Sequence, residues 1–438
     1  MKKVLLLGVL LGIKFLSAQV NPPDIRINPE YSYRMLEPNQ NLRKVNLLWD
    51  AKRGGDLTPG KLVIGTSVIA LMDYQSSNTD SKFGYLMRHP TAANEVGTSV
   101  SEAVIHSFQL GITVPVNQWI TTYAELLYDP QQSFGAGTIT ALARNQVQLR
   151  KAFVLFADPE KTPFFLAIGK MDTPFGQTGS VSPFTNSTMW HAFGGLTYGA
   201  HIGLSTRGLN LNFMAVQGGA QFRSANTIVG DGTNVPSKLN NFVADLNYKL
   251  PLSDQVSLTA GGSYLMGSAY NQGFPVQHFM PGVENNPAYT YYGRLDLGSR
   301  FFVKAGFAKT VKEWQGTHNP TPPLNVFTAS KVSSLDYGAQ YVVKQTNDRA
   351  YVLSGEFSNF IAGPKGAPWE RQNQTVIGFA ALLKNSSKLF VELFSTKGYA
   401  PLNFISGSND FEPFPPGQTH SDRDAATLGI VLGANITL

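Results

Sequence analysis

The last fifteen residues of the chain, DAATLGIVLGANITL at 424–438, alternate strictly between two kinds of side chain. Every second residue is apolar: Ala426, Leu428, Ile430, Leu432, Ala434, Ile436 and Leu438. Because a β-strand places alternate side chains on opposite faces, this stretch predicts a strand with one wholly apolar face. No following element in the sequence covers that face. We therefore expect it to meet an apolar surrounding such as a lipid bilayer.

The composition favours membrane strands over membrane helices. Only 15% of the 438 residues are charged, and away from the N-terminus no apolar run approaches the roughly 20 residues of a membrane helix. Apolar residues instead occur in short alternating runs. Cysteine is absent, which excludes thiol catalysis and cysteine-ligated metal and fits an exported bacterial protein.

The first residues have the pattern of a secretory signal. Lys2 and Lys3 precede an apolar run at 4–13, and Ser17-Ala18-Gln19 predicts cleavage after residue 18. Loss of residues 1–18 would lower the formal charge from +6 to +3, because three lysines go with them. The basic balance therefore gives no reason to expect a nucleic-acid partner.

Residues 19–61 are predicted to form a periplasmic leader. Helical spacing of apolar residues over 42–52 predicts a short helix there, and an extended arm or a plug segment is equally compatible with the pattern. The β-barrel is expected to occupy residues 62–438.

Sixteen runs of strand pattern follow, each near the ten residues of a tilted membrane strand. Their bounds are 62–73, 104–115, 118–129, 144–156, 163–171, 198–206, 208–217, 239–250, 254–266, 289–298, 301–310, 332–344, 350–361, 374–384, 387–397 and 424–438.

The connections between these runs alternate between tight turns, rich in Pro, Asn, Asp, Gly and Ser, and long polar segments. This rhythm predicts an all-β fold, a transmembrane up-and-down antiparallel barrel with short periplasmic turns and long extracellular loops. The final strand should close the ring by pairing with 62–73. A soluble β-sandwich would not explain the strict alternation of short and long connections, and a propeller would need a repeat that is absent.

The alternation also predicts which side chains line the lumen. In the run 144–156, Arg144, Gln146, Gln148 and Arg150 share the predicted inner face, whereas Val147, Leu149, Phe153 and Leu155 share the outer one. Lys151 breaks this pattern and requires a bulge or a shifted register. The same parity places further polar residues inward: Glu125, Asp245, Arg294, Asp296, Lys304, Asp336, Gln340 and Glu356.

Aromatic residues gather near the predicted strand ends, and those that face outward would form interfacial girdles. They are Tyr123, Tyr128, Phe164, Tyr289, Tyr291, Tyr292, Phe301, Phe357, Phe360, Phe390 and Phe394.

A catalytic arrangement is not expected. The common hydrolase, metalloprotease and phosphate-loop motifs are absent, and the seven histidines are scattered singly. We expect no enzyme activity, no cofactor and no metal site. A barrel lipase, which needs only one serine and one histidine on adjacent strands, is the alternative that spacing leaves open.

The long connection at 172–197 is rich in glycine, proline and aromatic residues. This composition predicts a loop that folds back into the pore and narrows it, the alternative being an ordinary exposed loop. Its candidate pore residues are Asp172, Phe175 and His191. They join the wall candidates Glu125, Arg144, Arg150, Arg294, Asp296, Lys304, Asp336 and Glu356.

A family resemblance centres on residues 163–219. Gly169-Lys170-x-x-x-Pro174-Phe175-Gly176, then Ser182-Pro183-Phe184, then the hairpin at 207–219 together resemble a segment of LbtU-type siderophore porins. The resemblance implies a sixteen-stranded outer-membrane barrel that takes up iron-siderophore complexes without a separate plug domain. The chain lacks the family's Asp after Ser182, and Gly218-Gly219 stands where Asn-Gly-Asp is usual.

Phosphate-selective porins are similar in strand count and in a Pro-Phe-Gly-like loop. They would require an inward ladder of Arg and Lys, whereas the predicted lumen here mixes both signs, which favours a weakly selective pore.

These patterns predict a porin of the bacterial outer membrane that passes small hydrophilic solutes by diffusion. The resemblance to LbtU-type porins implies iron-siderophore complexes as the substrate class. The expected partners of the porin are the lipid bilayer, the barrel-assembly machinery and the solutes, with a homo-trimer left open. A surface adhesion protein that uses the barrel to anchor the loops 74–103 and 398–423 is the alternative from another functional class. The sequence ends in Leu438 where the usual assembly signal has an aromatic residue.

Overall fold

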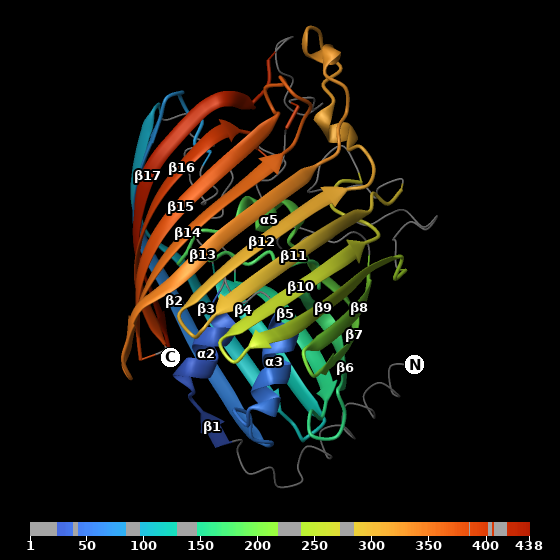
Figure 1. Ribbon diagram of the computed structural model, residues 1–438, viewed down its shortest axis with the longest axis vertical. Coiled ribbons are helices and arrows are strands. Elements are labelled where there is room, and N and C mark those ends of the chain that lie inside the picture. Colours follow the sequence, from blue (N-terminus) through green and yellow to red (C-terminus); the bar gives the residue numbers. More distant parts are fainter. Residues whose placement is uncertain are drawn as a thin grey trace, which may run out of the picture.

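The computed structural model describes residues 24–37, 43–84, 97–128, 147–217, 238–271, 284–384, 386–401, 405–406 and 418–438. Within these ranges sixteen antiparallel strands, β2 to β17, form one closed barrel (Figure 1). A short additional strand, β1, joins the edge of β2 in parallel. The predicted barrel and its number of strands are confirmed.

Every predicted run corresponds to one strand. The bounds are β2 (Lys61–Ser77), β3 (Ser99–Pro115), β4 (Ile120–Tyr128), β5 (Gln148–Ala157), β6 (Phe164–Asp172), β7 (Leu196–Thr206), β8 (Leu209–Val216), β9 (Asn241–Ser253), β10 (Val256–Leu265), β11 (Ala288–Leu297), β12 (Phe301–Thr310), β13 (Ser333–Gln345), β14 (Arg349–Ile361), β15 (Arg371–Leu383), β16 (Ser387–Tyr399) and β17 (Asp422–Thr437). Strands β2 and β3 are longer than predicted, so the connection between them is shorter than 74–103.

The ring closes where β17 pairs with β2, with Ile430 opposite Tyr74. At the end of β17 the backbone N–H of Thr66 donates to the carbonyl of Leu438 at 3.0 Å, and the N–H of Leu438 returns a bond to Thr66 at 2.9 Å. This pairing leaves no open sheet edge at the seam, as a membrane strand requires.

The outer face of the barrel is apolar. Leu428 is 65% exposed on β17, whereas its neighbour Val431 points inward and is fully buried. Ile202, Leu246 and Ile377 are likewise exposed on other strands. Large exposed apolar side chains around a whole barrel are stable only against lipid, so the wall spans a bilayer. None of the helices in the described residues is long and apolar enough to cross a membrane.

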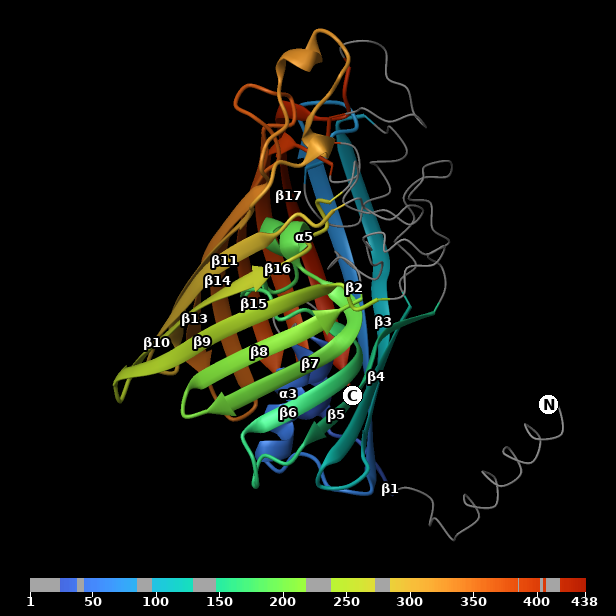
Figure 2. The same cartoon turned by 90° about the vertical axis from the view of Figure 1, so that its right-hand side faces the viewer.

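Tight hairpins lie at one end of the barrel and the longer connections at the other (Figure 2). The turn between β7 and β8 is an example. Arg207 and Gly208 both have positive φ, 45° and 86°, which is the backbone of a two-residue hairpin whose twist matches its strands.

One predicted face is wrong and has a clear cause. On β5 a bulge shifts the register, so that Glu125 pairs with Lys151 while Leu126 pairs with Leu149. The extra residue reverses the alternation along the strand. Phe153 and Leu155, predicted to face lipid, therefore point inward and are buried, and Lys151 also turns inward.

The aromatic residues near strand ends divide between the two faces. Tyr128, Phe164 and Tyr291 are exposed on the outside, whereas Phe390 and Phe394 are buried inside. Tyr123, Tyr292 and Phe360 are also buried. The face on which a side chain lies is set by the alternation along the strand, and not by how close the residue is to the strand end. A girdle can include only the outward members.

The N-terminal segment places its two helices inside the barrel at the end that carries the tight turns, and its exposed strand at the rim of that end (Figure 2). It contains β1 (Asp24–Arg26), α2 (Pro29–Leu36) and α3 (Lys44–Arg53). Asn28 caps α2 by accepting a bond from the N–H of Tyr31, and Pro29 occupies the first helical position. The sequence predicted only the second helix.

Apolar packing holds these helices against the wall. Tyr31, Met35, Leu36, Leu48 and Trp49 are all buried. The Trp49 ring lies 5.4 Å from Phe165 of β6, and the hydroxyl of Tyr31 bonds Thr113 of β3 at 2.8 Å. At about 1.5–3 kcal/mol for each large side chain, this burial stabilises the docked segment by on the order of 10 kcal/mol before ordering costs.

Candidate pore constriction

Residues 173–195 connect β6 to β7 and cross the lumen. We call them the inner loop. The loop carries one short helix, α5 (Thr188–Phe193). One anchor of the loop is Glu392 on β16, a fully buried carboxylate that accepts bonds from the N–H groups of Phe184 at 2.6 Å and Thr185 at 3.1 Å. The hydroxyl of Thr185 also donates to Glu392. The loop is thus held from the opposite side of the ring.

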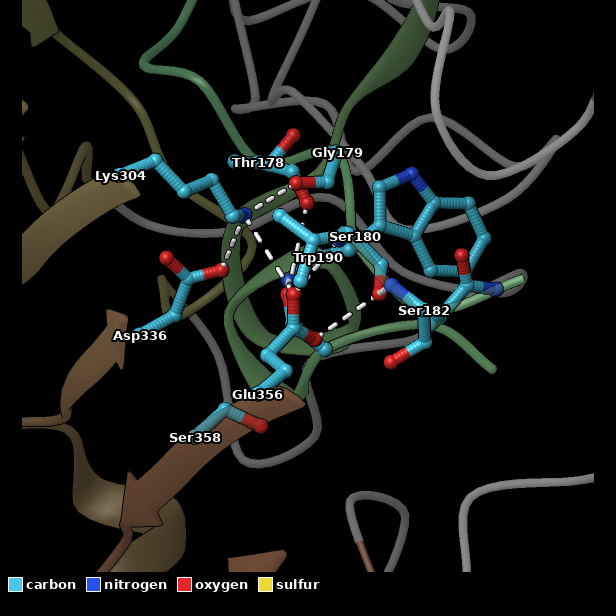
Figure 3. A network of polar contacts seen from close by, with 12 residues as sticks. Thr178, Gly179, Ser180, Ser182, Trp190, Lys304, Asp336, Glu356 and Ser358 are labelled. Atoms are coloured by element: carbon cyan, nitrogen blue, oxygen red, sulfur yellow. Dashed lines mark hydrogen bonds and ion pairs between the residues drawn. The ribbon is translucent and has the colours of Figure 1, made fainter. Parts of the chain in front are cut away.

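A second anchor is a charged cluster on three neighbouring strands (Figure 3). Lys304 of β12 lies 2.7 Å from Asp336 of β13 and 3.6 Å from Glu356 of β14, and it also donates to the carbonyl of Gly179 in the inner loop. Glu356 accepts bonds from the Ser180 hydroxyl at 2.9 Å and the Val181 N–H at 2.8 Å. Buried charges of this kind are stable only when paired and hydrogen-bonded, as these are.

Further wall hydroxyls and amides bind the inner loop along its length. The N–H of Gly176 donates to Ser263 on β10 at 2.9 Å, and the N–H of Thr188 donates to Ser358 on β14 at 3.0 Å. Gln374 on β15 donates to the carbonyl of Asn186 at 2.9 Å. With contacts from β10 to β16, the loop is a fixed partition inside the barrel.

The N-terminal segment is bound to the wall by Arg43, just before α3. Its guanidinium lies 3.0 Å from Asp245 of β9, and it also donates to the carbonyl of Gly176 in the inner loop. Asp245 accepts four more bonds from wall side chains. Their donors are Asn212, Asn247, Ser263 and Tyr292.

Lys388 of β16 links Glu37, the residue after α2, to the inner loop. Lys388 of β16 pairs with Glu37 at 3.0 Å, and the same ammonium donates to the carbonyl of Pro183. The segment and the inner loop therefore share two cations, Arg43 and Lys388, and form one partition across the lumen.

A cavity of about 390 Å³ remains between α3, the inner loop and the wall. Arg294 of β11 contributes its guanidinium, which is 39% exposed, stacks 3.6 Å above the ring of Phe302 and pairs with Asp296 at 2.8 Å. Helix α3 contributes Asp50, whose side chain is 52% exposed, to the lining of the same cavity. Carboxylate and guanidinium groups of both signs thus border the cavity.

The residues predicted from sequence to line the pore divide into three groups. Asp172, Phe175, Arg294 and Lys304 border the cavity. Asp296, Asp336 and Glu356 pair with those cations and are not among the cavity-lining residues.

The remaining candidates lie elsewhere. Glu125 pairs with Arg150 at 3.2 Å and accepts a bond from Tyr123 at 2.9 Å. His191 is buried in α5, edge-on to Trp190. Arg144 lies outside the described residues.

Several residues of the partition were missed at the sequence level. Lys388 and Glu392 share one parity on their strand, and the alternation there contains the signal that places both inward. Arg43 and Asp50 carry no such signal, because Asp50 lies in a helix and Arg43 immediately precedes that helix. In the described part of the chain, no group of three or more His, Asp or Glu residues is arranged to hold a metal ion.

The sequence matches no protein-family model and no curated protein. Among solved structures, the barrel is similar to OprB of Pseudomonas putida, with a TM-score of 0.52 at 8% identity over 86% of this chain and 94% of that chain. It is also similar to the outer membrane channel DcaP of Acinetobacter baumannii, with a TM-score of 0.49 at 12% identity over 86% and 97%. At such identity the likeness to OprB shows a shared barrel fold.

Proposed function

We propose that this protein is a porin of the bacterial outer membrane that passes small hydrophilic solutes by diffusion. The observation that carries the proposal is an apolar outer wall around a polar lumen, narrowed by a partition to a cavity of about 390 Å³. Solutes would partition into the lumen and be filtered by size and charge at this cavity.

The pairing of charges in the lumen supports weak selectivity over selection of one ion class. Selection of phosphate would call for a ladder of cations, and the inward cations Lys304, Arg294 and Arg150 each pair with a carboxylate. The phosphate-selective alternative is therefore less favoured.

Conductance across a planar bilayer tests the proposal. The purified protein should produce step-like currents whose size scales with salt concentration. An electrically silent protein that inserts into the bilayer would contradict the proposal and favour the adhesion alternative, whose loops 74–103 and 398–423 lie partly outside the described residues.

The iron-siderophore substrate is a narrower proposal that rests on the resemblance of residues 163–219 to LbtU-type porins. A strain that lacks the protein should take up less radiolabelled ferric siderophore than its parent, with uptake restored by a plasmid copy. Unchanged uptake would remove the siderophore and leave the general pore untouched.

A further inference from the structure

Helix α3 presents two distinct faces inside the barrel. Val45, Leu48 and Trp49 are buried toward the wall. The residues that border the cavity are Arg43, Asn46, Leu47 and Asp50. Both sets follow the spacing of three and four residues that defines one side of a helix, so the helix packs one face on the wall and turns the other toward the passage.

The contacts of α3 with the wall are too extensive for a gate that opens each time a solute passes. Apolar rings, the buried pair between Arg43 and Asp245 and the pair between Glu37 and Lys388 all hold the segment. Movement of the segment away from the wall would break both of these charge pairs and expose its buried apolar side chains to the lumen, which is unfavourable.

The charges that α3 offers to a solute are not equal. Arg43 is committed to a fully buried carboxylate, Asp245. Among the described residues, Asp50 pairs with Arg53, an exposed partner on the same helix that is not among the residues bordering the cavity, and the charge of Arg34 also acts on it. Exposed pairs of this type are loose, so the Asp50 carboxylate acts on ions in the cavity.

We propose that α3 is a permanent wall of the passage and that Asp50 determines its charge selectivity, together with Arg294, which borders the same cavity. This inference rests on the proposed porin function and assigns a specificity-determining role to the N-terminal segment, in addition to the inner loop and the barrel wall. The ions concerned are small inorganic or organic ions that enter the cavity.

The reversal potential in a potassium chloride gradient tests the role of Asp50. Asp50→Lys should raise the permeability of chloride relative to potassium severalfold, and Asp50→Asn should shift it in the same direction by less. Glu30→Lys is the matched control, because Glu30 is exposed on α2, does not border the cavity and undergoes the same change of charge. That control should keep the wild-type ratio.

An engineered disulfide tests whether the wall is permanent. The chain has no cysteine, and a Cβ on Gly111 of β3 would lie 3.6 Å from Cγ of Leu36. Leu36→Cys combined with Gly111→Cys is therefore placed to join α2, and with it the N-terminal segment, to the wall. Oxidised and reduced forms should conduct equally. A current that falls on oxidation and recovers on reduction would show that the segment opens, and would overturn the inference.

The outcomes separate this inference from the proposed function. If the wild-type protein conducts and both Asp50 variants keep its selectivity, the role of Asp50 is wrong and the porin function stands. A silent wild-type protein sinks the porin itself. If Asp50→Lys does not fold, the isosteric Asp50→Asn decides alone.

Discussion

Gly169 occupies a backbone position that other residues adopt only with strain. Its φ is +140°, and a Cβ there would lie 2.2 Å from the carbonyl oxygen of Ala152 on β5. Gly169→Ala should therefore destabilise the barrel by more than about 1 kcal/mol, through strain and displacement of the neighbouring strand. The temperature at which the folded form is lost, followed by gel mobility in mild detergent, measures the effect.

Gly355→Ala provides the matched control, because nothing lies within 4 Å of a Cβ at that position. It should unfold at the wild-type temperature. Equal behaviour of the two variants would contradict the role assigned to Gly169.

At the level of single residues, strand alternation predicted the inward direction of Glu125, Asp245 and Lys304 from the sequence alone. It failed at Phe153 and Leu155, since a bulge adds one residue and reverses the faces beyond it. A bulge leaves little trace in sequence. The sequence signal here was Lys151 on an otherwise apolar face. It indicated an irregularity in the strand but did not show at which residue the bulge lies.

The inner loop depends on Glu392 as its acceptor from β16. Glu392→Ala removes the acceptor of three bonds, each worth about 1–3 kcal/mol where no water replaces it. The loop should loosen, and single-channel recordings should show a larger, noisier conductance. Glu370→Ala is the control, because Glu370 bonds Gly366 in the connection between β14 and β15. A quiet current of wild-type size in Glu392→Ala would show that the loop is held without this carboxylate.

At the level of elements, the strands were readable because their period and turns are local signals. The position of the N-terminal helices was not. The pair between Arg43 and Asp245 joins residues 202 apart, and the pair between Glu37 and Lys388 joins residues 351 apart. No local sequence pattern identifies partners this far apart, so the sequence of residues 19–61 was compatible with either an extended arm or a plug.

For the barrel as a whole, a charged side chain on the lipid-facing surface should be more destabilising the deeper it lies in the bilayer. Leu432 lies within β17 with its side chain exposed, and Leu438 is exposed just beyond the end of the same strand. Leu432→Lys should lower the free energy of unfolding from vesicles by about 2–4 kcal/mol, and Leu438→Lys by about 0–1 kcal/mol. Urea titration of folding into lipid vesicles measures both values. Equal costs would contradict a membrane-spanning β17.

The docking of the N-terminal segment has a consequence for the order of folding. Its partners lie on β9 and β16, far apart along the chain, and its apolar contacts lie on β3 and β6. These surfaces face one another only after β17 has paired with β2. The N-terminal segment, which is made before the barrel strands, would therefore reach its final place after them, once the ring has formed around it. An unfinished barrel would hold an open lumen.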